Sequence, residues 1–220
     1  MNQIYKQNTE LYNLNKDFSL NNSSGNLNKA DIYRIKKILS LLPKGNFSIL
    51  DLGSNNGELT NIISKRYNQV VGLEFIKENV SSARKKFPNI KFIEGDITNL
   101  RIKQKFDIII AGEIIEHVLS PINSLKKIKK IIKKQGILII SVPNIVSLQK
   151  RIKSLLGIIP DNSDDHLHLF TKKKLIDTCK RAGFDVKEVT STKKTYLFRF
   201  LIPMPLDSLS NTLIIKLINP

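Results

Sequence analysis

The chain has 220 residues, and 41% of them are hydrophobic, which is enough to bury the core of one domain. Its 36 Lys and Arg outnumber 19 Asp and Glu, and the net charge of +17 favours an anionic partner. Aromatic residues make up only 7%, Trp is absent and no RNA-binding signature occurs, so nucleic acid is not a favoured partner. A single cysteine, Cys179, excludes an internal disulfide.

The first 28 residues are polar and rich in Asn, and they lack the apolar core of a secretory signal. We expect 1–28 to be a flexible lead-in and 29–220 to be a single cytoplasmic domain. A helix is expected over 30–42. Much of the charge lies in the run 126–134, which we interpret as the solvated face of a helix. Two interpretations of the net charge of +17 stay open: an anionic partner, or a bias of the whole composition towards Lys.

The segment 48–63, SILDLGSNNGELTNII, predicts a buried strand, a tight turn and the start of a helix. Asp51 lies near the end of that strand, where its carboxylate would face the cleft. A dinucleotide pyrophosphate would be repelled there. A cationic ligand, such as a sulfonium that carries an α-amino group, would be attracted.

The spacing of the turn also argues against a dinucleotide enzyme. Asn55 and Glu58 stand where a G-x-G-x-x-G motif needs Gly or Ala, and only Gly53 and Gly57 remain. Asn tolerates left-handed backbone better than most residues, so the turn is still feasible.

Further apolar runs predict a series of strands separated by helices. The strands are expected at 70–75, 91–97, 105–110 and 135–144, and the helices at 57–66, 77–86, 122–134 and 172–182. This alternation predicts parallel βαβ units and a sheet that is covered on both faces.

The order of these motifs resembles the class I S-adenosylmethionine-dependent methyltransferases over roughly residues 30–190. DLGSNNGE is similar to their first motif, with two Asn in place of Gly, and VVGLE, EGDI and FDIIIAGEIIEHV resemble the later motifs. The resemblance is to ubiquinone O-methyltransferase-like enzymes and to methyltransferases that accompany glycan assembly. It implies a Rossmann-like, doubly wound α/β fold with seven strands, an antiparallel last strand and helices on both faces. The sixth strand would be 182–191, and the seventh either 195–201 or 211–218.

The same resemblance implies a binding site for S-adenosylmethionine. Asp51 would approach the amino group of its methionine part, and Glu74 would hold the ribose hydroxyls. Asp96 would accept from the adenine amino group, with Ile97 near the ring, and Glu113 would face the reacting centre. The implied cofactor-binding residues are Asp51, Gly53, Asn55, Gly57, Glu74, Asp96, Ile97 and Glu113.

The three histidines, His117, His166 and His168, are the candidates for a catalytic base, because imidazole exchanges protons near neutral pH. With Glu113 and Glu116, the first two also have the ligand types of a divalent metal site. An E-x-x-E-H group with a distant His resembles the metal site of two methyltransferase groups, which act on ubiquinone precursors and on small-RNA 3′ ends. A structural or acid–base role is the favoured alternative, so a metal is not the preferred cofactor.

The insertion 145–170 and the apolar tail 195–220 are expected to form the acceptor wall. Lys150, Arg151 and Lys153 would then face an anionic acceptor. The tail has a second interpretation, as a surface that touches a membrane or a lipid-linked substrate, which would make the protein peripheral to the membrane.

The function expected from these features is methyl transfer to oxygen or nitrogen of a small-molecule, glycan or lipid-linked acceptor. An RNA or protein methyltransferase is the alternative. A nucleoside-binding enzyme of another class and an inactive scaffold are less favoured, since Asp51, Glu74 and Asp96 are all present. The residues do not name the acceptor or the atom that is methylated.

Overall fold

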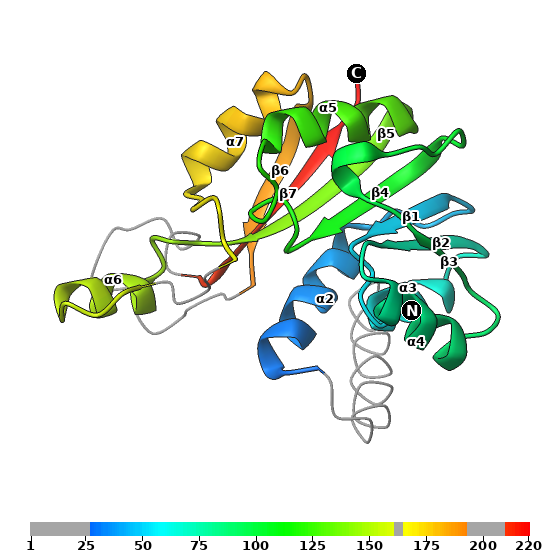
Figure 1. Cartoon of the computed structure of the whole chain (residues 1–220). Helices are drawn as coiled ribbons and strands as arrows, with labels where there is room; N and C mark the ends of the chain where they lie inside the picture. The colour runs from blue at the N-terminus through cyan, green and yellow to red at the C-terminus, as the bar shows by residue number, and fades with distance from the viewer. Residues whose placement is uncertain (1–26, 161–164, 193–209) are drawn as a thin grey trace, which may run out of the picture.

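In a computed structural model, the described residues are 27–160, 165–192 and 210–220. They form one seven-stranded sheet with the order β3-β2-β1-β4-β5-β7-β6 (Figure 1). The strands are β1 (Ser48–Leu52), β2 (Gln69–Glu74), β3 (Lys91–Glu94), β4 (Phe106–Gly112), β5 (Ile132–Pro143), β6 (Asp185–Ser191) and β7 (Thr212–Ile218). The first five strands pair in parallel, and β7 pairs antiparallel with both β5 and β6. The expected doubly wound, Rossmann-like fold is confirmed.

The C-terminal strand corrects one expectation about the apolar tail. Residues 212–218 lie between β5 and β6, which settles the seventh strand in favour of 211–218; the rival 195–201 lies outside the described residues. Leu213, Ile214 and Ile215 have no exposed surface. This part of the tail is therefore interior sheet, and it supplies neither an acceptor wall nor a membrane-contacting surface.

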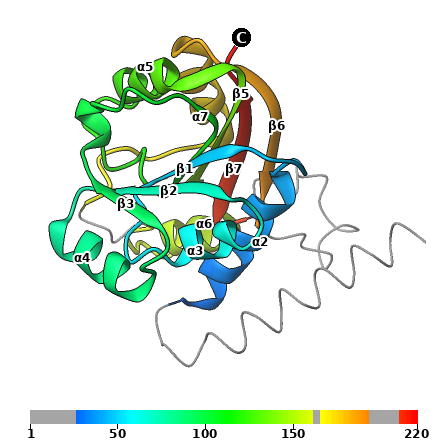
Figure 2. The same cartoon turned by 90° about the vertical axis from the view of Figure 1, so that its right-hand side faces the viewer.

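Helices cover both faces of the sheet (Figure 2). They are α2 (Lys29–Leu41), α3 (Glu58–Ser64), α4 (Lys77–Lys86), α5 (Pro121–Ile131), α6 (Leu148–Leu155) and α7 (Lys172–Arg181), with a short 3-10 turn, η2 (Ile97–Asn99). One core joins α5 and α7 to alternate strand residues such as Leu50, and the other joins α2 and α3 to residues such as Ile49. Successive side chains along a strand point to opposite faces of the sheet, so each central strand contributes to both cores.

The boundary between α5 and β5 differs from the sequence expectation. The helix ends at Ile131, three residues before the expected end, and the strand follows at once. Gln135 adopts a left-handed backbone with φ 59°, and its N–H donates to the carbonyl of Asn219. The side-chain amide of Asn219 also donates to the carbonyls of Ile132 and Lys133, so contacts with the chain beyond β7 take the place of the expected last turn of the helix.

The carboxyl ends of β1 and β4 meet where the winding of the sheet reverses, which is where ligands bind in folds of this type. Each of the first four strands ends near a residue that the sequence singled out for the site. No helix among the described residues is long and apolar enough to cross a membrane.

Candidate active site

The turn between β1 and α3 has three residues in left-handed backbone conformations. Gly53 has φ 70°, Asn55 has φ 47° and Gly57 has φ 83°. The expected tolerance of Asn55 for this conformation is confirmed. A Cβ atom at Gly53 would lie 2.7 Å from Ile114 Cδ1, so the close contact also favours a residue without a side chain at this position.

Asp51 is buried at the end of β1 and is 2% exposed. Its carboxylate accepts a hydrogen bond of 2.6 Å from the Thr60 hydroxyl. Burial raises the pKa of Asp51 to about 7, while the Thr60 bond and the charge of Arg34 oppose that rise. A cationic group that enters the pocket beside Asp51 would stabilise its charged form.

Glu74 ends β2 and is 8% exposed. Its two carboxylate oxygens accept hydrogen bonds of 2.9 Å, one from the Asn55 N–H and one from the Ile76 N–H. A carboxylate has about four acceptor positions, so both oxygens can still accept from a ligand. The side chain is thus fixed by the turn that it faces.

The acid after β3 is held in a similar way. Asp96 precedes η2, and its carboxylate accepts from both the N–H and the hydroxyl of Thr98 at 2.6 Å. Ile97, next to it, is 7% exposed and belongs to the core. Both expected residues therefore lie at the same edge of the sheet as Asp51 and Glu74.

A pocket that is open to solvent lies between α2 and the β1–α3 turn. Its lining includes Asp51 and Gly53, together with Arg34 and Asp31 from α2. Arg34 forms an ion pair of 3.0 Å with Asp31 and reaches to 3.8 Å from Glu113. Among the described residues that line the pocket, Arg34 is the one with a cationic side chain.

Sequence reasoning missed Arg34, because it precedes the first strand on a helix without a recognisable motif. Its spacing from Asp31 is that of an ordinary helical ion pair, which is common on solvated faces. Only the packing of α2 against the sheet brings it to the site.

Glu113 follows β4 directly and has a left-handed backbone with φ 53°, an uncommon conformation for a residue with a side chain. Its N–H donates to the carbonyl of Ser141 at 3.0 Å. Burial raises the pKa of the carboxyl group, and the nearby charge of Arg34 lowers it. The residue links the pocket to the loop that follows β4.

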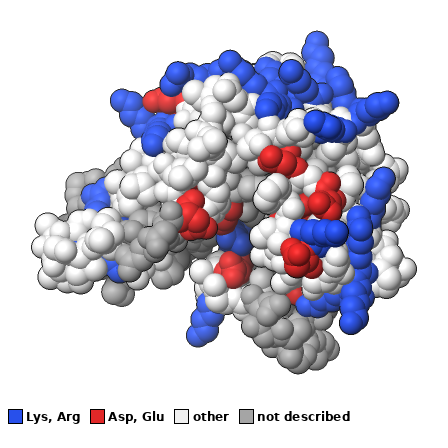
Figure 3. Space-filling view, viewed as in Figure 1, with Lys and Arg blue, Asp and Glu red and all other residues white. Residues whose placement is uncertain are grey.

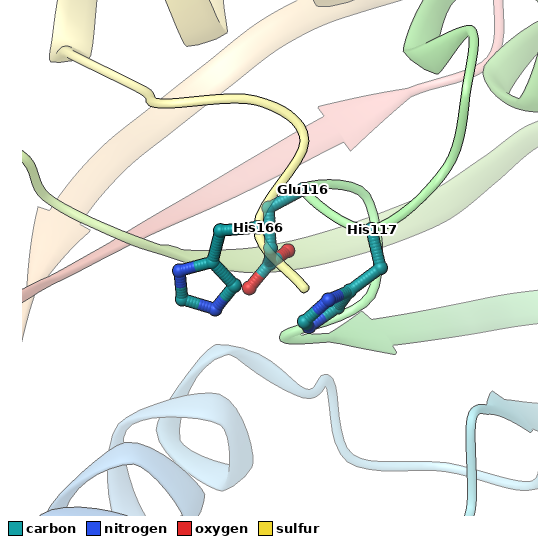
Figure 4. Close-up of side chains that lie close together, drawn as sticks. All are labelled: Glu116, His117 and His166. Carbon is teal, nitrogen blue, oxygen red and sulfur yellow. The ribbon is translucent and has the colours of Figure 1, made fainter. Parts of the chain in front are cut away.

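That loop brings three of the four candidate metal ligands together. Glu116, His117 and His166 each offer an atom within 4.8 Å of the others, and Figure 4 shows both imidazole rings beside the Glu116 carboxylate. Glu113 is outside this group of three. The group joins the loop after β4 to the end of the insertion, although the two are almost 50 residues apart.

Glu116 is the most unusual member of the cluster. It has no exposed surface, and neither of its carboxylate oxygens has a hydrogen-bond partner among the described residues. Burial, and then the charge of Glu113, raise its pKa to about 8. An unpartnered buried carboxyl group is costly, and such groups occur at functional sites.

The rings of His117 and His168 each contact a backbone carbonyl. His117 Nδ1 lies 3.0 Å from the carbonyl oxygen of Asp165, and this contact favours the tautomer with the proton on Nδ1. Nε2 of His117 would then carry a lone pair. His168 Nε2 lies 3.2 Å from the carbonyl of Leu119, so His168 supports the loop beside the cluster.

The winding reversal, the pocket beside it and the acids after β1, β2 and β3 together define a nucleoside-binding α/β protein. Residues 43–195 match a family model described as a methyltransferase domain. The chain belongs to this family and is a class I S-adenosylmethionine-dependent methyltransferase.

Several curated relatives have related names. A ubiquinone biosynthesis O-methyltransferase of Pelagibacter ubique is 27% identical over 157 residues, which cover 67% of this chain and 65% of the relative. The chain thus spans about two thirds of that relative's length. A ubiquinone/menaquinone biosynthesis C-methyltransferase of Campylobacter jejuni is 24% identical over 71% of this chain and 78% of its own. An (S)-coclaurine N-methyltransferase of Thalictrum flavum is 30% identical over 54% of this chain and 35% of its own.

Solved structures show the same fold. The N-methyltransferase NodS of Bradyrhizobium japonicum, in complex with S-adenosyl-L-homocysteine, has a TM-score of 0.63 at 15% identity and covers 89% of this chain and 90% of its own. The [4+2]-cyclase SpnF has a TM-score of 0.65 at 14% identity, with 86% and 82% covered. Because so different a reaction shares the architecture, the acceptor has to be argued from the site.

Proposed function

We propose that this methyltransferase acts on a hydroxyl oxygen of a small, ring-bearing acceptor of the quinol type. The observation that carries the proposal is the cluster of Glu116, His117 and His166 near Glu113, a residue that Arg34 of the pocket lining reaches to 3.8 Å. O-methylation needs an acceptor for the hydroxyl proton, and this cluster offers one. The names of the relatives, which refer to ubiquinone biosynthesis, support a quinol-type acceptor over RNA or protein.

The pocket suits the zwitterionic methionine part of the cofactor. Asp51 would attract the ammonium group, and Arg34 would bind the carboxylate, since both line the same pocket. Glu74 would accept from the ribose hydroxyls and Asp96 from the adenine amino group. Bound in this way, the cofactor would supply an electrophilic methyl group on its sulfonium, and Glu113 lies near Arg34, which lines the pocket.

The transfer itself is an in-line displacement. The acceptor oxygen attacks the methyl carbon, the bond from that carbon to sulfur breaks, and the sulfur keeps the electron pair. The hydroxyl proton passes to Nε2 of His117 or to His166. Buried Glu116, when ionised, would stabilise the imidazolium that forms. His168 would position the loop and take no proton.

A divalent cation is a second use for the same cluster. One carboxylate and two imidazoles within 4.8 Å have the ligand types of a zinc or manganese site, and the unpartnered oxygens of Glu116 fit this role. A bound cation would lower the pKa of the acceptor hydroxyl. We favour the acid–base use, in which the three side chains act without metal.

Methyl transfer from labelled S-adenosylmethionine to a small catechol or quinol tests the proposal. Of His117→Ala and His166→Ala, the variant that removes the base should lower kcat by about 10²–10⁴-fold, while cofactor affinity stays the same. His168→Ala is the matched control and should lose much less. Transfer to amines but not to hydroxyls, or unchanged kcat in both variants, would contradict the proposed reaction.

Exhaustive chelation separates the two uses of the cluster. Full activity after chelation supports the acid–base use. Loss that added Mn²⁺ or Zn²⁺ restores, together with calorimetric binding of that ion to the wild type but not to Glu116→Gln, would establish the metal site instead.

A further inference from the structure

Helix α6 has an unusual environment for a helix of a compact domain. None of its eight residues is buried, and Figure 1 shows it at one end of the molecule, away from the sheet. The stretch that it begins, LQKRIKSLLGII, carries several apolar side chains that meet solvent. They are Ile152 (48% exposed), Leu155 (86%), Leu156 (69%), Ile158 (49%) and Ile159 (71%).

The apolar side chains of α6 form one stripe, and two of its three basic side chains lie on the opposite face, with Arg151 beside the stripe. Leu148, Ile152 and Leu155 follow the spacing of one helical stripe, and Lys150 and Lys153 fall on the opposite side. No Asp or Glu occurs from 145 to 160. Figure 3 shows the corresponding lobe as mostly uncharged surface with a few basic side chains.

This combination distinguishes α6 from the other basic surface of the protein. On α5, Lys126 and Lys130 are exposed while Leu125 and Ile128 are fully buried against the sheet. There the apolar face is used by the core and the charges are merely solvated. On α6 both faces are presented to the outside.

We propose that α6 and residues 156–159 bind the surface of an anionic bilayer. A basic face beside exposed aliphatic side chains matches an interface in which acyl chains lie beneath anionic headgroups. Nucleic acid would attract the charges but leave the apolar side chains in water. The site would lie in the plane of the interface, since α6 is too short to cross the bilayer.

The position of α6 connects this surface to the active site. The chain leaves β5 at Pro143, and Ile145 N–H donates to the carbonyl of Phe170, so the two ends of the insertion lie side by side. The returning end carries His166 and His168. A bilayer bound by α6 would therefore lie next to the acceptor side, which suits an acceptor dissolved in the membrane. The binding proposal itself does not depend on the acceptor.

Sedimentation of the full chain with vesicles tests the inference. The protein should bind vesicles of phosphatidylcholine mixed with phosphatidylglycerol and bind pure phosphatidylcholine at least about tenfold more weakly. Leu155→Gln with Ile159→Gln, and separately Lys150→Glu with Lys153→Glu, should each lower binding to the mixed vesicles about tenfold or more. The exposure of Leu155 and Ile159 predicts that the first pair leaves the unfolding temperature and the affinity for S-adenosylmethionine unchanged.

Lys126→Glu with Lys130→Glu on α5 is the matched control, because it changes the net charge by the same amount elsewhere. It should retain most of the vesicle binding. Equal loss in this control would reduce the effect to net charge and overturn the proposal. So would a wild type that ignores anionic vesicles, or α6 variants whose only change is from dimer to monomer, since α6 would then bind a second copy of the chain.

Discussion

Among single residues, Asp51 places a buried carboxyl group in the pocket, and its ionisation lowers the stability of the folded chain. The carboxyl group has a raised pKa of about 7 in the folded chain, against 3.8 for the ordinary side chain. Between these pH values the folded state holds a proton that the unfolded state has released, so stability falls as pH rises through the interval. In the proposed function, the ammonium group of the bound cofactor would offset this cost by stabilising the charged form of Asp51.

Asp51→Asn should therefore stabilise the protein without cofactor at pH 8 and have little effect at pH 4. The upper limit of the gain is about 4 kcal/mol, from about three pKa units at 1.36 kcal/mol each. The amide oxygen can still accept from Thr60. Urea unfolding at the two pH values measures the difference. An equal change at both pH values would mean that ionisation of Asp51 is not its source.

Glu74→Ala should weaken S-adenosylmethionine binding by on the order of 2–4 kcal/mol, because two charge-assisted hydrogen bonds to the ribose would be lost. The turn would also lose the acceptor of the Asn55 N–H. Calorimetry gives the affinity. Glu94→Ala is the control, since Glu94 pairs with Glu74 in register and is exposed. Equal affinities in wild type and Glu74→Ala would contradict the assigned role of Glu74.

At the scale of elements, the β1–α3 turn depends on glycine for two separable reasons. Gly57 has φ 83° and precedes α3, and a Cβ atom there would lie 2.6 Å from Phe92 Cζ. Gly157 has φ 70°, but a Cβ atom there would have no other atom within 4 Å. Substitutions at Gly57 and Gly157 therefore separate the cost of left-handed backbone strain from the cost of steric overlap.

Gly57→Ala should lower the free energy of unfolding by about 2–4 kcal/mol, from left-handed strain and overpacking of Phe92. Gly157→Ala should lose only the strain, about 1–2 kcal/mol. Chemical denaturation of both variants measures the two losses. If they were equal, the close approach of Phe92 would contribute nothing to the need for Gly57.

Sequence patterns predicted most elements of this fold because its central strands are buried on both faces. Continuous apolar runs such as that of β4 mark them directly. The expected end of α5 was wrong because residues after Ile131 make contacts with distant segments: Ile132 pairs with Phe106 of β4, and the side-chain amide of Asn219 donates to the carbonyls of Ile132 and Lys133. The histidines were found by residue type, but their meeting with Glu116 depends on the return of the insertion, which no local spacing encodes.

At the scale of the whole molecule, the last strand of the chain joins the two cores. Ile214 packs in the core under α2, and Ile215 packs in the core under α5 and α7, although the two are neighbours in sequence. Because β7 lies between β5 and β6, these contacts form only when the end of the chain inserts into the sheet. The two cores should therefore unfold together.

Ile214→Ala and Ile215→Ala should each lower the free energy of unfolding by about 2–5 kcal/mol, since both side chains are fully buried. Asn211→Ala, at an exposed position before β7, should change it by less than about 0.5 kcal/mol. Unfolding followed by far-ultraviolet circular dichroism and by calorimetry should give one coincident transition in all three variants. Two separate transitions in either Ile variant would show that each core is stable alone, and β7 would then be an accessory to the sheet instead of the strand that unites it.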